Sequence, residues 1–191
     1  MCTVTYIPLK DTCFITSNRD ENSKRITAMP PEIYDGINNR KVYPKDSQAG
    51  GTWIACKDNG TAAVLLNGAF KKHIPSPPYK RSRGLVFLEI LDAENPVGHF
   101  MDISMEAIEP FTMIILDESL HECRWDGTIK HCSVLNKSNS YIWSSLHYMM
   151  KQRLLEGDNG LMHLGMKPLH PGLTIFYIFT SSLVMVIFQM T

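Results

Sequence analysis

The sequence predicts an α+β domain in which antiparallel strands form layered sheets that pack with helices. Runs rich in β-forming residues are joined by short turns such as Asn59-Gly60 and Asp126-Gly127, which are typical of hairpins. Two apolar stretches, 84–93 and 96–108, have the spacing of helices. The order of several strands, two helices and then more strands differs from the regular alternation that builds a parallel βαβ fold.

Composition excludes some classes of function. The chain has 191 residues, enough for one domain with a sizeable core, and its 19 basic and 19 acidic residues cancel. A global charge that would attract nucleic acid is therefore absent, and we expect no nucleic-acid partner. Seven histidines show no metal-ligand spacing, so we expect neither a metal nor another cofactor.

The cysteines indicate a reducing compartment, and a cytoplasmic location is the expectation. They are odd in number, widely spaced and free of a CxxC pair, and the first strand shows no apolar signal-peptide core. The five are Cys2, Cys13, Cys56, Cys123 and Cys132.

The opening stretch 1–8 predicts a strand whose second residue, Cys2, is a candidate nucleophile. Cysteine is small enough for the initiator methionine to be removed before it. Cys2 would then carry both a thiol and a free α-amine. Because an α-amine has a pKa of about 7.7–8.0, part of it can accept a proton near neutral pH. The alternative is that Cys2 is a small buried hydrophobe.

A second β-rich run, 13–17, follows the polar connection 10–12, so the two strands are predicted to pair antiparallel. Asn18-Arg19-Asp20-Glu21 comes next and is either a plain loop or part of a site. In a tight hairpin these residues lie beside the start of the first strand. Arg19 and Asp20 would then flank Cys2, where a guanidinium lowers the pKa of a thiol and a carboxylate orients the amine.

Residues 22–48 contain several prolines and are predicted to form a long functional loop or flap. Strands are predicted at 50–56 and 61–66, and the second ends in Asn67-Gly68. The Asn67 amide could stabilise an oxyanion. The alternative is an ordinary Asn-Gly turn.

The middle of the chain supplies the remaining elements. The basic, proline-interrupted run 71–83 is either a solvated loop or a contact for an anionic group. The second helix is predicted to begin at Pro96, a favourable first-turn residue. Strands are predicted at 110–117, 122–125, 128–134 and 141–145, and a short helix at 146–156.

The tail 173–191 contains no charged residue. Its 19 residues approach the ~20 needed to span a bilayer as a helix. Its β-forming residues and the central Thr180-Ser181-Ser182 favour two strands, or an aberrant end, over a membrane anchor. We therefore divide the chain into a domain at 1–156 and an atypical apolar segment at 157–191.

Several ordered blocks make residues 1–150 similar to the NRDE family, also called the Transport and Golgi organisation protein family. The blocks are Met-Cys-Thr at the start, 17–21, 49–54, 65–68, Arg83-Gly84 and 143–145. The chain beyond Glu156 departs from the family, so the fold is expected to be incomplete at its C-terminus.

The family resembles N-terminal nucleophile hydrolases, which include penicillin V acylase and bile salt hydrolase. The resemblance implies an αββα sandwich of two antiparallel sheets flanked by helices. It assigns catalytic roles to Cys2, Arg19, Asp20 and Asn67. The acylases also use a second Asn and a second Arg, which the sequence does not place.

Two functions remain open from the sequence. The first is an N-terminal cysteine hydrolase that cleaves a small molecule with a linear amide or acyl group. The second is a non-catalytic lipid- or haem-related binding or trafficking protein that uses the same pocket. A membrane-tethered version of either is a third, less favoured hypothesis, and the sequence does not disclose the oligomeric state.

Overall fold

The computed structural model describes most of the chain. The described ranges are 2–20, 26–36, 39–71, 73–75, 77–145, 163–170, 173–179 and 183–190. For Asp20 and for the three ranges after residue 162, the backbone path is described and the side chains are not.

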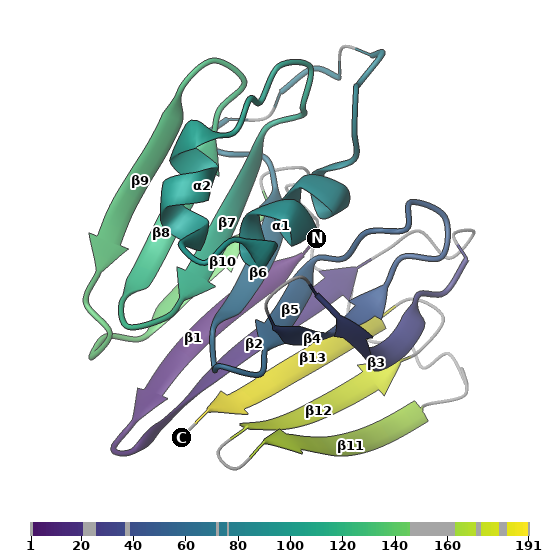
Figure 1. The fold of residues 1–191 in the computed structure, drawn as a ribbon, viewed down its shortest axis with the longest axis vertical. Helices are drawn as coiled ribbons and strands as arrows, with labels where there is room; N and C mark the ends of the chain where they lie inside the picture. The colour runs from purple at the N-terminus through teal and green to yellow at the C-terminus, as the bar shows by residue number, and fades with distance from the viewer. Residues whose placement is uncertain are drawn as a thin grey trace, which may run out of the picture.

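Two antiparallel sheets form the body of the molecule (Figure 1). One has six strands in the order β10-β1-β2-β13-β12-β11. Its strands are β1 (Thr3–Leu9), β2 (Thr12–Asp20), β10 (Tyr141–Ser144), β11 (His163–His170), β12 (Leu173–Phe179) and β13 (Leu183–Met190). The other has seven strands in sequential order. These are β3 (Met29–Asp35), β4 (Arg40–Lys45), β5 (Ile54–Lys57), β6 (Ala62–Asn67), β7 (Phe111–Leu116), β8 (Leu120–Trp125) and β9 (Lys130–Leu135).

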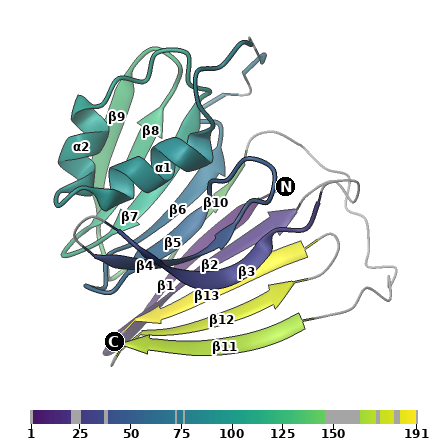
Figure 2. The same cartoon turned by 45° about the vertical axis from the view of Figure 1, so that its right-hand side comes forward.

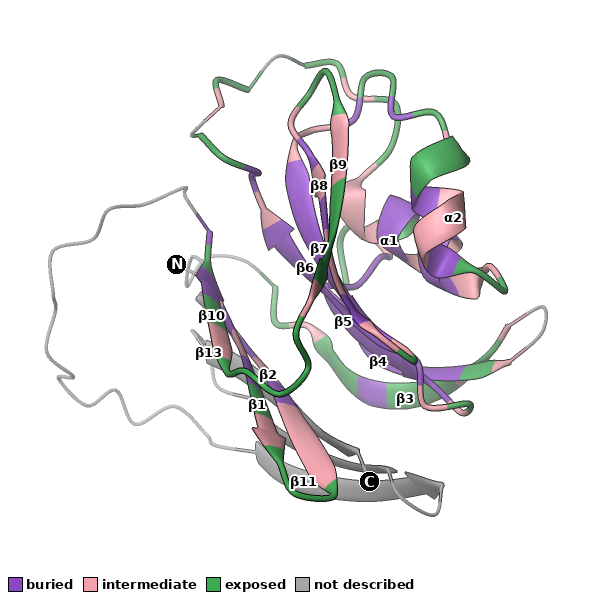
Figure 3. Ribbon diagram, turned by 90° about the vertical axis from the view of Figure 1, so that its left-hand side faces the viewer, coloured by how far each residue is buried: buried purple, intermediate pink, exposed green. Residues whose placement is uncertain are grey.

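The two described helices cover the outer face of the seven-stranded sheet. They are α1 (Arg83–Asp92) and α2 (Pro96–Asp102). Figure 3 shows the seven-stranded sheet between these helices and the six-stranded sheet. Because β6 and β7 are covered on both faces, nearly all their residues are buried. This arrangement confirms the α+β class with two antiparallel sheets, and the predicted helix at 146–156 lies outside the described residues.

Local sequence signals set the ends of both helices. The Ser82 hydroxyl accepts a hydrogen bond from the Leu85 N–H and caps α1. The Asn95 side chain caps α2, with Pro96 in its first turn as predicted. The second helix ends at Asp102, six residues before the predicted end at Ile108, although Ile108 remains buried in the segment that follows.

The first hairpin has the predicted antiparallel pairing. Thr3 pairs with Asn18 at its open end, and Leu9 pairs with Thr12 at the turn. Val4 and Ile15 are buried among the side chains that the hairpin turns toward the core. The last residues of β2 therefore lie at the same end of the sheet as the start of β1.

The predicted long loop at 22–48 is wrong, because this stretch contains β3 and β4. Prolines suggested a break, yet β3 is an edge strand, where proline leaves no ladder hydrogen bond unmade. The register of β3 shifts between Met29 and Glu32, on either side of Pro30-Pro31. In β4, Val42 and Tyr43 are buried despite the neighbouring Pro44.

The apolar tail forms two strands, which confirms the interpretation favoured for it. Figure 2 shows β13, β12 and β11 continuing the six-stranded sheet outward from β2. β13 pairs with β2 along its length, with Val184 opposite Arg19 and Leu183 opposite Asp20. Among the residues that the structure describes, no helix combines the length and the apolar content that crossing a membrane requires.

A close contact between two glycines joins the seven-stranded sheet to the helical layer. A Cβ added at Gly51 would lie 2.5 Å from the Gly84 carbonyl carbon and 2.8 Å from the Leu85 nitrogen. These neighbours are backbone atoms at the start of α1, so they cannot move aside as a flexible side chain would. Only glycine at position 51 allows this approach of the loop before β5 to α1.

We expect Gly51→Ala to lower the free energy of unfolding by about 1–3 kcal/mol, because the added methyl group overlaps backbone. Chemical denaturation at neutral pH measures the effect. Gly50→Asn is the comparison variant, because position 50 has open space around an added Cβ and φ of +70°, a conformation that asparagine adopts more readily than most residues. It therefore reports the backbone cost of replacing a neighbouring glycine without any steric overlap. Equal stability of wild type and Gly51→Ala would contradict the role assigned to this contact.

Candidate functional site

A cavity of about 150 Å³ lies where the open end of the first hairpin meets the seven-stranded sheet and the start of α1. Its lining includes three of the four residues that sequence analysis selected: Cys2, Arg19 and Asn67. The full lining is Cys2, Arg19, Asp46, Ala49, Gly51, Thr52, Trp53, Leu65, Asn67, Ser82, Arg83, Gly84 and Glu109. Asp20 follows Arg19 at the end of β2, and its side chain lies outside the described residues.

Cys2 is partly buried and held at both polar atoms of its backbone by Ser145. The Cys2 nitrogen donates to the Ser145 hydroxyl at 3.1 Å. The Ser145 N–H donates to the Cys2 carbonyl at 2.9 Å. This nitrogen is the atom that becomes the α-amine if Met1 is removed. Ser145 lies in the block 143–145 of the sequence, and no local signal predicted its contact with Cys2.

Arg19 is fixed by an ion pair and by an aromatic ring. Its Nη2 lies 3.0 Å from Asp46 Oδ2, and its guanidinium lies 4.2 Å from the centroid of the Trp53 ring. The other Asp46 oxygen accepts the N–H groups of Gln48 and Ala49 at 3.0 and 2.9 Å. The carboxylate is thus held by the turn before β5, and it holds Arg19 at the cavity wall.

Arg83 supplies a second guanidinium to the cavity. It pairs with Glu109 at 3.1 Å and donates to the Pro110 carbonyl at 3.3 Å. Burial lowers the pKa of Arg83, and the charges of Glu109 and Cys2 oppose that shift. Arg83 and Cys2 both belong to the lining of the cavity. The available sequence signal was its place at the end of the basic run 71–83, directly before a helix.

Asn67 reaches the cavity from the seven-stranded sheet. It ends β6 opposite Phe111, and the turn that follows uses Gly68 at φ of +85°. The Gly68 N–H donates to the Pro110 carbonyl at 3.0 Å, which fixes the turn. The site is therefore shared between the two sheets, with Cys2 on one and Asn67 on the other.

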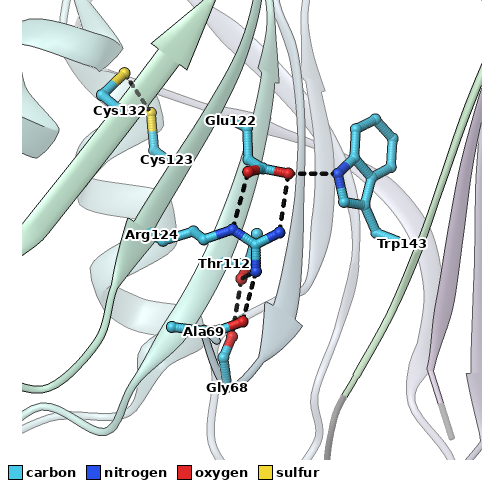
Figure 4. Close-up of polar contacts among 8 residues, drawn as sticks. All are labelled: Gly68, Ala69, Thr112, Glu122, Cys123, Arg124, Cys132 and Trp143. Atoms are coloured by element: carbon cyan, nitrogen blue, oxygen red, sulfur yellow. Dashed lines mark hydrogen bonds and ion pairs between the residues drawn. The ribbon is translucent and has the colours of Figure 1, made fainter. Parts of the chain in front are cut away.

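A polar network centred on Glu122 joins the two sheets (Figure 4). Both Glu122 oxygens accept hydrogen bonds from Arg124, at 2.9 and 3.0 Å. The Trp143 indole N–H donates to Glu122 at 2.6 Å. Glu122 lies on β8 and Trp143 on β10, two residues before Ser145. The network therefore fixes β10, the strand that directly precedes Ser145.

The same network reaches the turn after Asn67. Arg124 donates to the Ala69 carbonyl and, at 3.3 Å, to the Thr112 hydroxyl. The Thr112 hydroxyl donates to the Gly68 carbonyl at 2.9 Å. The strand before Ser145 and the turn after Asn67 are thus both connected to the Glu122–Arg124 pair.

The pKa of Glu122 reflects this environment. Burial raises it, while hydrogen bonds from Arg124 and Trp143 and the Arg124 charge lower it more. The net pKa is below its ordinary value, so Glu122 is ionised at neutral pH. In the described part of the chain, no three His, Cys, Asp or Glu residues gather in a way that could hold a metal ion.

Comparisons with known proteins cover most of the chain. A family model described as Transport and Golgi organisation 2 matches residues 1–161, a stretch that includes every residue lining the cavity. Among solved structures, the chain is similar to penicillin V acylase from Agrobacterium tumefaciens, with a TM-score of 0.43 and 10% identity over 70% of this chain. The chain spans about half of that acylase, 49% of its length. No curated protein matches.

We expect Glu122→Gln to lower the free energy of unfolding at pH 7 by about 2–3 kcal/mol, because a largely buried Arg124 loses its charged partner. The folded-state pKa of Glu122 lies below its ordinary value of 4.5, so the pair's contribution is complete above pH 4.5. It is lost as the pH falls through the folded-state value. The difference between wild type and variant should therefore shrink below pH 4.5 in denaturation series.

Glu106→Gln is the matched control. Glu106 pairs with Lys80 on the surface, where solvent screens the pair, so no measurable change is expected. An unfolding free energy of Glu122→Gln equal to that of wild type at pH 7 would refute the structural role of the network.

Proposed function

We propose that the chain, which belongs to the Transport and Golgi organisation 2 family, is an N-terminal cysteine hydrolase that cleaves a linear amide or a related acyl compound. The observation that carries the proposal is the cavity shared by Cys2, Arg19 and Asn67. The hydrogen bond from the Cys2 nitrogen to Ser145 supports it, because this nitrogen is the expected base.

The proposed reaction begins after Met1 is removed. The Cys2 thiol gives its proton to its own α-amine, and the sulfur attacks the substrate carbonyl carbon. The Asn67 amide donates a hydrogen bond to the oxyanion of the tetrahedral intermediate. The intermediate collapses to a thioester, and the leaving amine takes the proton from the α-ammonium group. Water then attacks the thioester, which releases the acid and restores the thiol.

The surrounding groups are assigned supporting roles. Arg19 and Arg83 place positive charge near the sulfur, which favours its thiolate form. Ser145 holds the α-amine in position beside the thiol. Asp20 is proposed to orient the same amine. The cavity of about 150 Å³ is small compared with ligand sites of about 300–1,000 Å³, so it suits the reacting carbonyl and a few adjoining atoms.

One observation favours a second function, a non-catalytic binding protein with the same cavity. The Cys2 backbone is bonded to the hydroxyl and the N–H of Ser145 just beyond the end of the β1–β10 ladder, a contact that would also suit a residue with a purely structural role. In that case Cys2 and Arg19 would bind an anionic or thiol-reactive ligand. A ligand that co-purifies, with no turnover of any amide in a panel, would support this alternative.

We expect Cys2→Ser to reduce the release of p-nitrophenolate from p-nitrophenyl acetate by roughly a thousand-fold or more, because the nucleophile is lost. Tryptic digestion separates the two thiols, because Cys2 lies in peptide 2–10 and Cys13 in peptide 11–19. The peptide that carries an acetyl group therefore identifies the thiol that reacted. Cys13→Ser is the matched control and should retain activity, because burial raises the pKa of the Cys13 thiol. Equal rates for wild type and Cys2→Ser would reject the hydrolase proposal.

Inserting Gln between Met1 and Cys2 separates the thiol from the α-amine. The inserted residue prevents removal of Met1, so Cys2 keeps its thiol and loses its adjacent base. We expect a fall of about 10²–10⁴-fold in rate, the usual contribution of a general base. Intact mass reports whether Met1 is present in each protein. An unchanged rate would show that Cys2 acts as a simple thiol and not as an N-terminal nucleophile.

A further inference from the structure

Two cysteines outside the cavity lie in contact across neighbouring strands. Cys123 on β8 is directly opposite Cys132 on β9, and their sulfur atoms are 3.2 Å apart. Figure 4 shows the two sulfurs facing each other, away from the Glu122–Arg124 pair. Apart from two thiols in one predicted hairpin, nothing in the sequence indicated this pairing.

The backbone geometry at this position suits a covalent bond. Directly opposed residues of an antiparallel pair have Cα atoms about 4.5 or 5.5 Å apart, depending on their place in the ladder. Disulfides need Cα separations of about 4.4–6.8 Å, so either value is suitable. Forming the bond requires the sulfurs to approach by about 1 Å, which side-chain rotation can supply without a change of register.

The two thiols differ in access to solvent. Cys132 is exposed on β9, the edge strand of the seven-stranded sheet, whereas Cys123 is fully buried. Burial, and then the contact with Cys132, raises the pKa of the Cys123 thiol. An external reagent therefore meets Cys132 first, and Cys123 is placed to react with whatever forms there.

We propose that Cys123 and Cys132 form a thiol–disulfide modification site that reacts with small disulfides such as glutathione disulfide. The Cys132 thiolate attacks one sulfur of glutathione disulfide, the S–S bond breaks, and one glutathione thiolate leaves. The Cys123 sulfur then attacks the Cys132 sulfur, and the Cys123 proton passes to the departing glutathione thiolate. The mixed disulfide then breaks, and the second glutathione leaves. Two protein thiols are oxidised, and one glutathione disulfide is reduced to two glutathione molecules.

Contact between the sulfurs decides which product accumulates. The second step is intramolecular, so it is favoured over reaction with another glutathione molecule. We therefore expect the internal disulfide to exceed the glutathione adduct on Cys132 by roughly ten-fold or more. This site does not depend on the proposed hydrolase activity, since neither cysteine lines the cavity.

The test uses the full-length protein equilibrated with glutathione and glutathione disulfide, then acid-quenched, alkylated with N-ethylmaleimide and digested with trypsin without reduction. Cys123 lies in peptide 84–124 and Cys132 in peptide 131–137, and each peptide has one cysteine. The expected product is the two peptides joined, with the link lost on reduction. Recovery of both peptides alkylated, or of 131–137 carrying glutathione as the main product, would overturn the proposal.

Variants identify the order of the two steps. Cys123→Ala should trap glutathione on peptide 131–137, because no second thiol displaces it. Cys132→Ser should leave peptide 84–124 alkylated and free of glutathione. Cys13→Ser is the matched control and should give the same linked product as wild type. Glutathione attached to peptide 84–124 of Cys132→Ser, formed as fast as the linked product forms in wild type, would also overturn the proposal, because Cys123 would then react without Cys132. If Cys123→Ala does not fold, the recovery of linked or unlinked peptides from the wild-type protein still decides the proposal.

Discussion

The register of the first hairpin is the constraint on which the candidate site depends. With Thr3 opposite Asn18, the residue before β1 and the last residues of β2 lie at one end of the six-stranded sheet. A shift of one residue would turn the buried side chains of the strand that moves, Val4 of β1 or Ile15 of β2, toward the other face. The core therefore holds the register, and the register brings Cys2 and Arg19 to the same cavity.

The site also depends on how the two sheets pack, because Cys2 and Asn67 belong to different sheets. Glu122 joins them through Arg124 on one side and Trp143 on the other. The hydrogen bond from Trp143 to Glu122 crosses between the sheets and requires one relative position of them, whereas the bonds from Arg124 hold Glu122 in place within β8. The network connects to Ser145 through the strand and to Asn67 through the following turn.

Charge in the cavity wall is balanced pair by pair. Arg19 faces Asp46 and Arg83 faces Glu109, so each cation has a carboxylate partner from a different element. This pairing offsets the cost of placing two guanidinium groups in a partly buried space. Each pair also holds its guanidinium in a fixed place at the cavity wall.

The sequence by itself determined the class of fold, the first hairpin, the starts of both helices and three residues of the cavity lining. These features rest on turn, cap and strand signals that act over a few residues. The sequence did not predict the two strands in 29–45, because the prolines there are tolerated only through the tertiary arrangement. Pro30 and Pro31 lie on the edge strand β3, and Pro44 of β4 lies opposite the register shift in β3. The apolar spacing of 96–108 similarly overstated the second helix, since Ile108 is buried without being helical.

Only the tertiary structure decided the partners of these residues. Ser145 meets Cys2 across 143 positions, and Asp46, Glu109 and the Cys123–Cys132 contact likewise carry no local signal that singles them out. Such contacts follow from the stacking of two sheets and the order of strands within them. Local signals thus specify which side chains are available, and the packing of distant strands decides which of them meet.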